Sequence, residues 1–267
     1  MNVSERRDEI LSYILNKNKV TISELKDKFE ISLITVHRDL DYLESEGYIR
    51  KERGGAEIKL SGSNEKSLLL RSTQNTKAKI LIAAYAKRFI HDDMTLLFDN
   101  STTVLALAPH LIGFKNLMVV TYFEEIMHEL SKPIYSCKLF CLGGEYSRLH
   151  RCYVGPFVDE RLSSIHVDAA FISAAAMNPM IGTMQHFADE SHRKKLILGS
   201  ADETNLLIDN TKIMGKALFS SGALSRFRRI ITNAPIEEDV IKLIKDTGVE
   251  LHIVSPTQEL QVEQQNQ

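Results

Sequence analysis

Seven short apolar runs, separated by stretches with helical periodicity, constrain the fold of this chain more than any other feature. They follow one another from about residue 76 and read TLLFD, LMVVT, KLFCLGG, DAAFISA, NLLID, RIITN and VELHIV. Strands that alternate with helices form βαβ units, in which the strands are parallel and both faces of the sheet are buried. Residues 76–256 are therefore predicted to form an α/β domain with a largely parallel sheet.

The polar segments that follow these runs predict a ligand site. The carboxyl ends of parallel strands meet at one edge of a sheet, so we expect a small-molecule crevice there. Ser101, Thr102 and Thr103 precede a predicted helix, whose N–H groups and dipole favour an anion such as phosphate. Lys212 would add positive charge. The alternative is that a threonine only caps this helix and that Lys212 is solvated, and the residues alone leave both open.

The first 60 residues show a second pattern, three amphipathic helices followed by a hairpin. Thr21 and Glu24 have the spacing of a capping box at the start of the second helix. Ser32 follows the end of that helix so closely that it is predicted to cap a third helix after a tight turn. Two helices joined in this way indicate a helix-turn-helix domain over residues 1–60.

The third helix and the hairpin carry the predicted DNA contacts. Val36, Leu40 and Leu43 form the buried stripe of this helix, so its opposite face is polar. Recognition helices present their N-terminal residues to base edges in the major groove. Gly47 is expected to end the helix, and YIRKE and AEIKL, joined by RGG, predict a basic wing on the phosphate backbone. The predicted DNA-binding residues are Ser32, Thr35, His37, Arg38 and Tyr42 on the helix and Arg50, Lys51 and Arg53 on the wing.

Total charge does not favour nucleic acid. Residues 1–60 hold 11 Lys/Arg and 12 Asp/Glu, and the whole chain has a formal net charge of -2. A small helical interaction domain with solvated charges is therefore the alternative. The acidic residues lie mostly on the first helix and in the C-terminal half of the third, away from the predicted contacts, and this distribution favours DNA binding.

Residues 5–56 resemble the N-terminal winged helix of the DeoR family of bacterial transcriptional repressors. The family pattern at the recognition helix is Ser-x-x-Thr-[Ile/Val]-Arg-Arg-Asp-Leu, and here the segment from Ser32 to Leu40 reads SLITVHRDL. His37 replaces the first arginine of the pair, which exchanges a permanent charge for a titratable one. A contact to phosphate or guanine at this position is expected to be weaker or different.

Residues 71–256 resemble the sensor domain of the same family, which is similar to sugar-phosphate isomerases and CoA transferases. The matching motifs are KILIAAYA, DNSTT, LGGEY, VDAAFISA and LIDNTKIMGKAL. The resemblance implies that the Asp99 to Thr103 loop and Lys212 hold the phosphate of a sugar-phosphate inducer. It further implies close backbone approach at Gly143, and Asp168 and Glu190 near the sugar. The implied effector-binding residues are Asp99, Asn100, Ser101, Thr102, Thr103, Gly143, Asp168, Glu190 and Lys212.

Two departures from the family pattern concern this crevice. Ser101 stands where the family has glycine, and ISAAAMN has alanines where glycines are usual. The added methyl groups are expected to intrude on a backbone that wraps phosphate closely. The pocket is then predicted to take a different ligand, to bind weakly or to have lost its ligand, whereas Lys212 favours retention.

An enzyme of the isomerase type is the competing class, with Asp168, Glu190 and Lys212 as acid and base groups. The fused winged helix favours a regulator, so no catalytic residue is predicted. His186, Glu190 and His192 do not have the spacing of a zinc motif on one helical face, and neither a metal nor another cofactor is expected.

The remaining segments complete the expected organisation. Residues 61–75 are predicted to be a linker and residues 257–267 a polar tail. Three cysteines without a secretion signal, and no apolar run long enough to span a bilayer, predict a cytoplasmic protein with reduced thiols. Together with the resemblance, the sequence predicts a repressor of sugar metabolism genes. Its expected partners are operator DNA, a phosphorylated sugar effector and further copies of the chain, as a dimer or tetramer.

Overall fold

The computed structural model describes residues 3–45, 48–58, 68–148 and 150–255. The chain divides into two compact units, Met1–Gln74 (unit 1) and Asn75–Gln267 (unit 2). Within the described residues, no helix is both long and apolar enough to cross a membrane.

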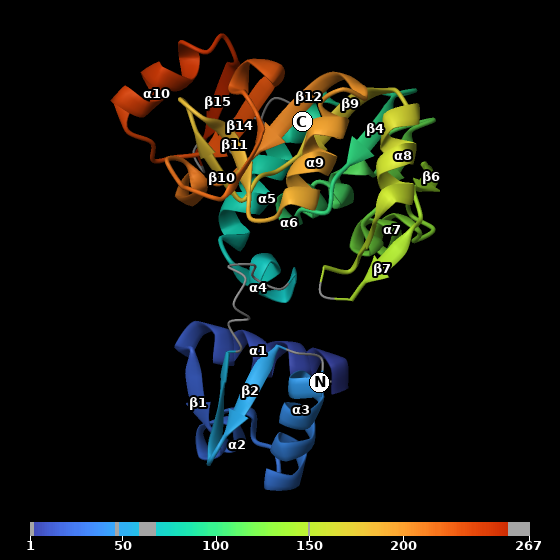
Figure 1. The fold of residues 1–267 in the computed structure, drawn as a ribbon. Helices are drawn as coiled ribbons and strands as arrows, with labels where there is room; N and C mark the ends of the chain where they lie inside the picture. Colours follow the sequence, from blue (N-terminus) through green and yellow to red (C-terminus); the bar gives the residue numbers. More distant parts are fainter. Residues whose placement is uncertain (1–2, 46–47, 59–67, 149, 256–267) are drawn as a thin grey trace, which may run out of the picture. The chain divides into compact units, whose positions relative to one another are not determined.

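Unit 1 contains the predicted three helices and hairpin (Figure 1). The helices are α1 (Val3–Lys17), α2 (Ile22–Phe29) and α3 (Leu33–Ser45), and the hairpin is β2 (Ile49–Glu52) and β3 (Gly55–Ile58). Their apolar faces meet in one core, because the helical residues recur at the spacing of a buried stripe. The core consists of Ile10, Leu11, Ile14, Val20, Leu25, Val36, Leu40, Leu43, Ile49 and Ala56.

The predicted helix starts in unit 1 are confirmed by their caps. The hydroxyl of Thr21 accepts the N–H of Glu24 at 3.2 Å, and the Glu24 carboxylate accepts the N–H of Thr21 at 2.8 Å. The Ser32 hydroxyl accepts the N–H of Thr35 at 3.1 Å. Glu30, in the left-handed conformation, makes the tight turn between α2 and α3. Gly47, which was expected to end α3, lies outside the described residues.

Two elements of unit 1 were not predicted. β1 (Lys19–Thr21) pairs with β3, so the wing is a three-stranded sheet of order β1-β3-β2. Gly55 permits this pairing, because a Cβ there would lie 2.1 Å from the carbonyl oxygen of Val20. The segment predicted to be a linker contains a short helix, α4 (Leu68–Thr73), which contacts α1.

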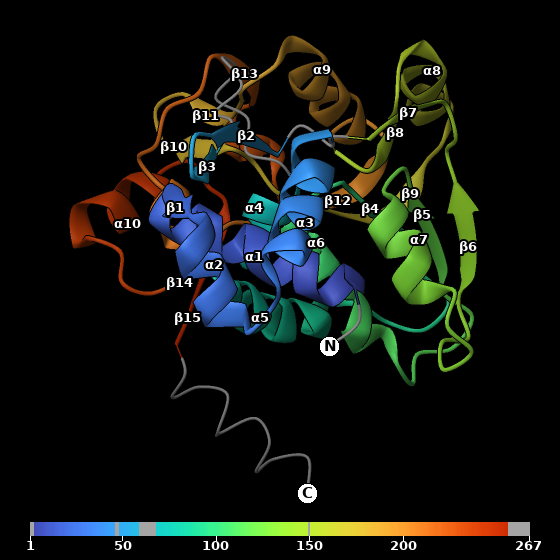
Figure 2. The same ribbon diagram turned by 90° about the horizontal axis from the view of Figure 1, so that it is seen from below.

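All seven predicted strands of unit 2 are present and form one parallel sheet. They are β4 (Thr95–Phe98), β5 (Met118–Thr121), β6 (Lys138–Cys141), β9 (Val167–Ile172), β12 (Ala201–Leu207), β14 (Arg229–Asn233) and β15 (Glu250–Val254). Their order is β15-β14-β12-β9-β4-β5-β6. Figures 1 and 2 both show β15 and β6 at opposite sides of this unit. The central strands β4 and β9 are buried almost throughout, as the apolar runs predicted.

Helices and two smaller sheets complete unit 2. The helices are α5 (Thr76–Ala86), α6 (Thr102–Leu105), α7 (Glu124–Leu130), α8 (Pro156–Ser164), α9 (Ala188–Ile197) and α10 (Glu238–Lys245). α5 packs against β12, β14 and β15 of the large sheet, and α9 packs against the three-stranded antiparallel sheet that contains β11 (Gly182–Gln185) and β13 (Phe219–Gly222). That antiparallel sheet, completed by β10 (Ala176–Asn178), and the hairpin of β7 (Glu145–Ser147) and β8 (Cys152–Val154) were not predicted.

Candidate functional site

The exposed face of α3 is the first candidate site. Val36, Leu40 and Leu43 are buried, whereas His37 and Arg38 are exposed, as the helical periodicity predicted. Ile34 is 81% exposed, which is unusual for so large an apolar side chain. It lies four residues before Arg38, so the two side chains share one face of the helix. The sequence interpretation did not include Ile34, although its position in the first turn was visible.

Ser32 and Thr35 have a local task at the start of α3. Besides the cap on the Thr35 N–H, the two hydroxyl oxygens lie 2.9 Å apart. Ser32 is exposed and Thr35 is half-buried. Both hydroxyls therefore fix the first turn of the helix.

A charged cluster joins α3 to α1. The Asp39 carboxylate is fully buried and accepts hydrogen bonds from Arg6 Nε at 2.7 Å and Arg7 Nε at 2.9 Å. The Arg7 guanidinium lies 3.9 Å from the ring centroid of Tyr42, which remains 41% exposed. Burial alone would raise the pKa of Asp39, but the hydrogen bonds from Arg6 and Arg7 outweigh it and hold this pKa below its ordinary value. The cluster fixes the orientation of α3 on α1.

The basic residues of the wing differ in their partners. Arg50 Nε donates to Glu57 at 3.0 Å, and Lys51 forms an ion pair with Asp41 of α3. Arg53 lies in the turn between β2 and β3, is exposed, and forms no ion pair with any described residue. Of the three wing residues predicted to contact DNA, Arg53 is thus the one that no carboxylate of the described residues pairs with.

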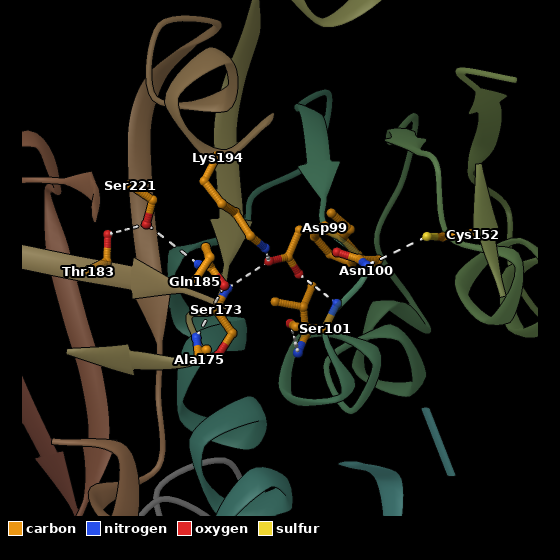
Figure 3. Close-up of polar contacts among 12 residues, drawn as sticks. Asp99, Asn100, Ser101, Cys152, Ser173, Ala175, Thr183, Gln185, Lys194 and Ser221 are labelled. Atoms are coloured by element: carbon orange, nitrogen blue, oxygen red, sulfur yellow. Dashed lines mark hydrogen bonds and ion pairs between the residues drawn. The ribbon is translucent and has the colours of Figure 1, made fainter. Parts of the chain in front are cut away.

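The second candidate site lies at the carboxyl edge of the sheet, around Asp99 (Figure 3). This fully buried carboxylate follows β4 and accepts the N–H of Ser101 at 2.9 Å and that of Ser173 at 2.7 Å. It also forms an ion pair with Lys194 of α9, whose side chain is only 2% exposed. Asp99 therefore holds together the ends of β4 and β9 and the helix α9.

Lys194 was missed by the sequence interpretation. It stands in the charged run SHRKK, where it is indistinguishable from the exposed Lys195 by residue type. Its one signal is helical spacing, because Lys194 lies four residues after Glu190 and on the same face.

The backbone at Ser101 does not require the glycine that the family has at this position. Its backbone has φ -95 and ψ 144, an ordinary extended conformation that does not require glycine. Its hydroxyl accepts the N–H of Val104 at 3.1 Å and caps α6. Thr102 and Thr103 are the first residues of that helix, and both are buried. The predicted helix cap is therefore Ser101 and not a threonine.

Two buried hydroxyl groups in the segments after β4 and β9 have no hydrogen-bond partner among the described residues. Thr103 Oγ1 and Ser173 Oγ make no hydrogen bond with the described residues. Buried hydroxyls are normally paired with protein, water or a ligand. Thr103 lies in the first turn of α6, which follows β4, and Ser173 directly follows β9, so the segments after both strands contribute an available hydroxyl.

Asn100 and Tyr122 extend the polar cluster. The Tyr122 hydroxyl donates to Asn100 Oδ1 at 3.3 Å, and Asn100 Nδ2 lies 3.6 Å from the Cys152 sulfur. Burial, and next the negative charge of Asp99, raise the pKa of Tyr122 well above its ordinary value. Glu190, half-buried in the first turn of α9, adds to the same effect. Glu190 is thus within electrostatic range of this cluster.

Asp168 requires a correction. It is the second residue of β9, and its carboxylate accepts the N–H of Thr95 at the start of β4 at 2.6 Å. Both positions are amino ends of parallel strands. Ser173 lies five residues further on, about 16 Å away at the rise of a strand. Asp168 therefore ties two strand starts together and does not belong to the crevice.

Gly143 and Lys212 complete the predicted set. Gly143 has φ +69, but a Cβ there would approach only Phe157, at 3.6 Å. Its neighbour Gly144 is more crowded, because a Cβ there would lie 2.8 Å from the Val154 carbonyl oxygen. Lys212 ends the short 3-10 helix Asn210–Lys212, which follows β12, and its Nζ is 3.8 Å from Asp209 Oδ2. Within the described residues, no group of His, Cys, Asp or Glu side chains is placed to hold a metal ion.

Comparisons with known proteins agree for both halves of the chain. The family model of the DeoR C terminal sensor domain matches residues 74–234, and that of the DeoR-like helix-turn-helix domain matches residues 6–61. The chain is 29% identical over 252 residues to the HTH-type transcriptional regulator IolR of Bacillus subtilis. This alignment covers 93% of this chain and 98% of the relative. It is 32% identical over 216 residues to the lactose phosphotransferase system repressor of Lactococcus lactis, covering 79% and 84%.

Among solved structures, ribose 5-phosphate isomerase A of Methanocaldococcus jannaschii is similar to part of the chain. The alignment covers 52% of this chain and 55% of that one, with 14% identity and a TM-score of 0.38.

Proposed function

This chain belongs to the DeoR family of transcriptional regulators, and from that membership we propose that it represses genes of sugar metabolism and releases or retains its operator in response to a phosphorylated sugar. The relatives of matching length are transcriptional regulators, and one is a repressor of a lactose phosphotransferase system. Unit 1 binds operator DNA in this proposal, and unit 2 binds the effector and joins copies of the chain into a dimer or tetramer.

The exposed N-terminal face of α3 is the observation that carries the DNA-binding role. Arg38 and Ile34 lie side by side on it, beyond the buried Asp39 cluster that fixes the helix. An arginine in this place can donate two hydrogen bonds to guanine in the major groove. Arg53 at the tip of the wing would contact phosphate, since no described carboxylate competes for it.

DNA binding is tested by selecting duplexes with the full chain from a random-sequence pool. Arg38→Ala should lower affinity for the selected duplex about 10- to 100-fold, the discrimination expected of one bidentate base contact. Arg148→Ala, which removes an exposed arginine of unit 2, serves as the control. Equal affinities of wild type and Arg38→Ala would contradict this assignment.

The unpartnered hydroxyls of Thr103 and Ser173 support an effector site at the carboxyl edge of the sheet. Lys212 follows the neighbouring strand β12 and would supply charge for a phosphate. Asp99 and Lys194 neutralise each other, and their role is to position the two loops. Hydroxyls and a lysine suit a sugar phosphate, because they can bond both its phosphate and its own hydroxyls.

Effector binding is tested by thermal denaturation of the full chain with ribose 5-phosphate, glucose 6-phosphate, fructose 1-phosphate and inorganic phosphate. A ligand that binds the folded state raises the melting temperature in a saturable manner. We expect one sugar phosphate to do so, and Lys212→Ala, but not Lys195→Ala, to abolish the shift. No shift with any sugar phosphate would contradict the sensor proposal.

A binding role is favoured over the isomerase alternative by the place of Asp168. The three groups considered for acid and base catalysis do not meet, since Asp168 lies at the amino edge of the sheet. Turnover of ribose 5-phosphate by the purified chain would reverse this preference.

A further inference from the structure

Asn75 stands at the point where the chain passes from unit 1 into unit 2. Unit 1 ends at Gln74, and Asn75 is the residue that precedes the first turn of α5. Its backbone adopts the left-handed conformation, with φ 53 and ψ 33. Asparagine tolerates this conformation better than most residues. Asn75 is therefore the first residue of unit 2 and lies where the backbone changes direction sharply.

The side chain of Asn75 does not serve α5. A residue at this position normally accepts an N–H of the first helical turn and so stabilises the helix. Asn75 makes no such bond. Its amide instead donates to Asp209 Oδ1 and to Thr211 Oγ1, at 2.9 Å each. These partners lie 134 and 136 residues further along the chain.

Asp209 connects Asn75 with Lys212. Its carboxylate is 1% exposed and lies in the loop after β12. One oxygen accepts from Asn75 and from the Thr211 hydroxyl, and the other lies 3.8 Å from Lys212 Nζ. Asn75 and the lysine proposed to hold the phosphate thus share one buried carboxylate.

We propose that Asn75 is the coupling residue through which an anion at Lys212 acts on the junction between the two units. The inference rests on the proposed function, because it needs an effector at Lys212 and DNA at unit 1. A phosphate that binds Lys212 competes with Asp209 for that ammonium group. The Asp209 carboxylate then loses part of its attraction to Lys212. The hydrogen bonds that it accepts from Asn75 and Thr211 strengthen or rearrange as a result. Because coupling is reciprocal, DNA bound to unit 1 changes the affinity for the anion by the same factor.

The attachment of α5 to unit 2 does not depend on Asn75. The Tyr85 hydroxyl oxygen of α5 lies 3.0 Å from Nδ1 of His252 in β15, and α5 packs against β12, β14 and β15. Loss of the Asn75 amide should therefore leave the helix in place and remove only the link to Asp209. This separation makes coupling measurable apart from folding.

The test uses Asn75→Gly in the full chain, because glycine keeps the left-handed backbone while removing the amide. Asn116→Gly is a matched control: Asn116 also has a left-handed backbone, with φ 55, and donates to Asp93 at 2.9 Å. Affinity for the selected duplex is measured with and without saturating ribose 5-phosphate, glucose 6-phosphate or fructose 1-phosphate. Affinity for the sugar phosphate is measured with and without the duplex. Asn75→Asp is the second variant, and it sets a carboxylate against Asp209.

In wild type and Asn116→Gly, one sugar phosphate should change DNA affinity by about 5- to 150-fold, the usual range of allosteric coupling. In Asn75→Gly and Asn75→Asp the change should fall to within about twofold, while each affinity of Asn75→Gly measured alone stays within about threefold of wild type. A wild-type response retained in both Asn75 variants would overturn the inference and leave the proposed function intact. Absence of any response in wild type would overturn the proposed function itself, and this inference with it.

Discussion

Ile34 is a single exposed side chain with a specific consequence for DNA recognition. Its apolar surface lies beside Arg38 and is suited to the methyl group of thymine. Replacing the contacted thymine by uracil removes only that methyl, so wild-type affinity should fall about fourfold, equivalent to roughly 0.8 kcal/mol. In Ile34→Ala the same replacement should have no effect. Competition binding with singly substituted duplexes measures both.

The control for this experiment is Ile80→Ala, which removes an apolar side chain of unit 2 that is 51% exposed. It should discriminate thymine from uracil as the wild type does. If Ile34→Ala also retained the discrimination at every thymine, Ile34 would not face a methyl group.

Asp39 gives a second prediction for single residues. Asp39→Asn removes one partner of a buried ion pair, and the free energy of unfolding of unit 1 should fall by about 2–4 kcal/mol at pH 7. The folded-state pKa of Asp39 is lowered, so its contribution is complete above the ordinary aspartate pKa of about 3.9 and is lost as the pH falls through the folded value. Wild type and variant should therefore converge in strong acid. Hydrogen exchange of amides in α1 and α3 measures this difference.

Asp41→Asn is the matched control, since Asp41 lies two residues away on the same helix but its side chain is 62% exposed. This substitution should leave the free energy of unfolding of unit 1 close to that of the wild type, as expected for the solvated ion pair of Asp41 with Lys51. A loss as large as that of Asp39→Asn would show that charge on α3, and not the buried cluster, stabilises the unit.

Among the elements, the strands of the large sheet could be predicted and the short ones could not. β4 and β5 are short runs rich in Leu, Val and Phe, and β9 is apolar except for Asp168, so the hydrophobic pattern was sufficient. β1 has three residues between two helices, and β13 reads FSSG, which favours a strand only weakly. Such strands are determined by tertiary pairing, for which one sequence contains little signal.

The site followed the same division. The Asp99 loop was predicted because it follows a recognisable strand, but nothing in SHRKK distinguished Lys194, which is buried, from Lys195. Asp168 was misplaced by the resemblance, although it stands at the beginning of its apolar run. Ligands bind at the carboxyl ends of parallel strands, so the position of Asp168 at the start of its strand already argued against a place in the ligand site.

The helix α9 supplies the prediction at this scale. Lys194→Met leaves the Asp99 carboxylate buried without its cation, and the free energy of unfolding of unit 2 should fall by about 3–5 kcal/mol. Lys195→Met, at the adjacent exposed position, should change it by less than about 0.5 kcal/mol. Urea denaturation of both variants measures the difference. Equal stabilities would mean that Asp99 is held by the backbone N–H groups alone.

For the whole molecule, the proposed oligomer makes a prediction about operator geometry. Two winged helices of one dimer should contact half-sites separated by about 10–10.5 base pairs or a multiple of it. Inserting half a turn of DNA between the half-sites of a selected duplex should weaken binding at least about tenfold, whereas a full turn should restore part of the affinity. Footprinting and titration of the three duplexes test this, and equal affinity for all three would indicate binding by independent copies.

The range of the contacts in each unit has a consequence for newly made chains. In unit 1, Arg6 and Asp39 are 33 residues apart, whereas in unit 2 the bond from Thr95 to Asp168 spans 73 residues and that from Asn75 to Asp209 spans 134. Local contacts form early, and domains fold as they leave the ribosome. The remaining residues after Gln74 take roughly 10–40 s to synthesise at about 5–20 residues per second. For that time a nascent chain carries the residues of unit 1 without those of unit 2, so under the proposed function its DNA-binding half exists before the half that binds the effector and joins the copies.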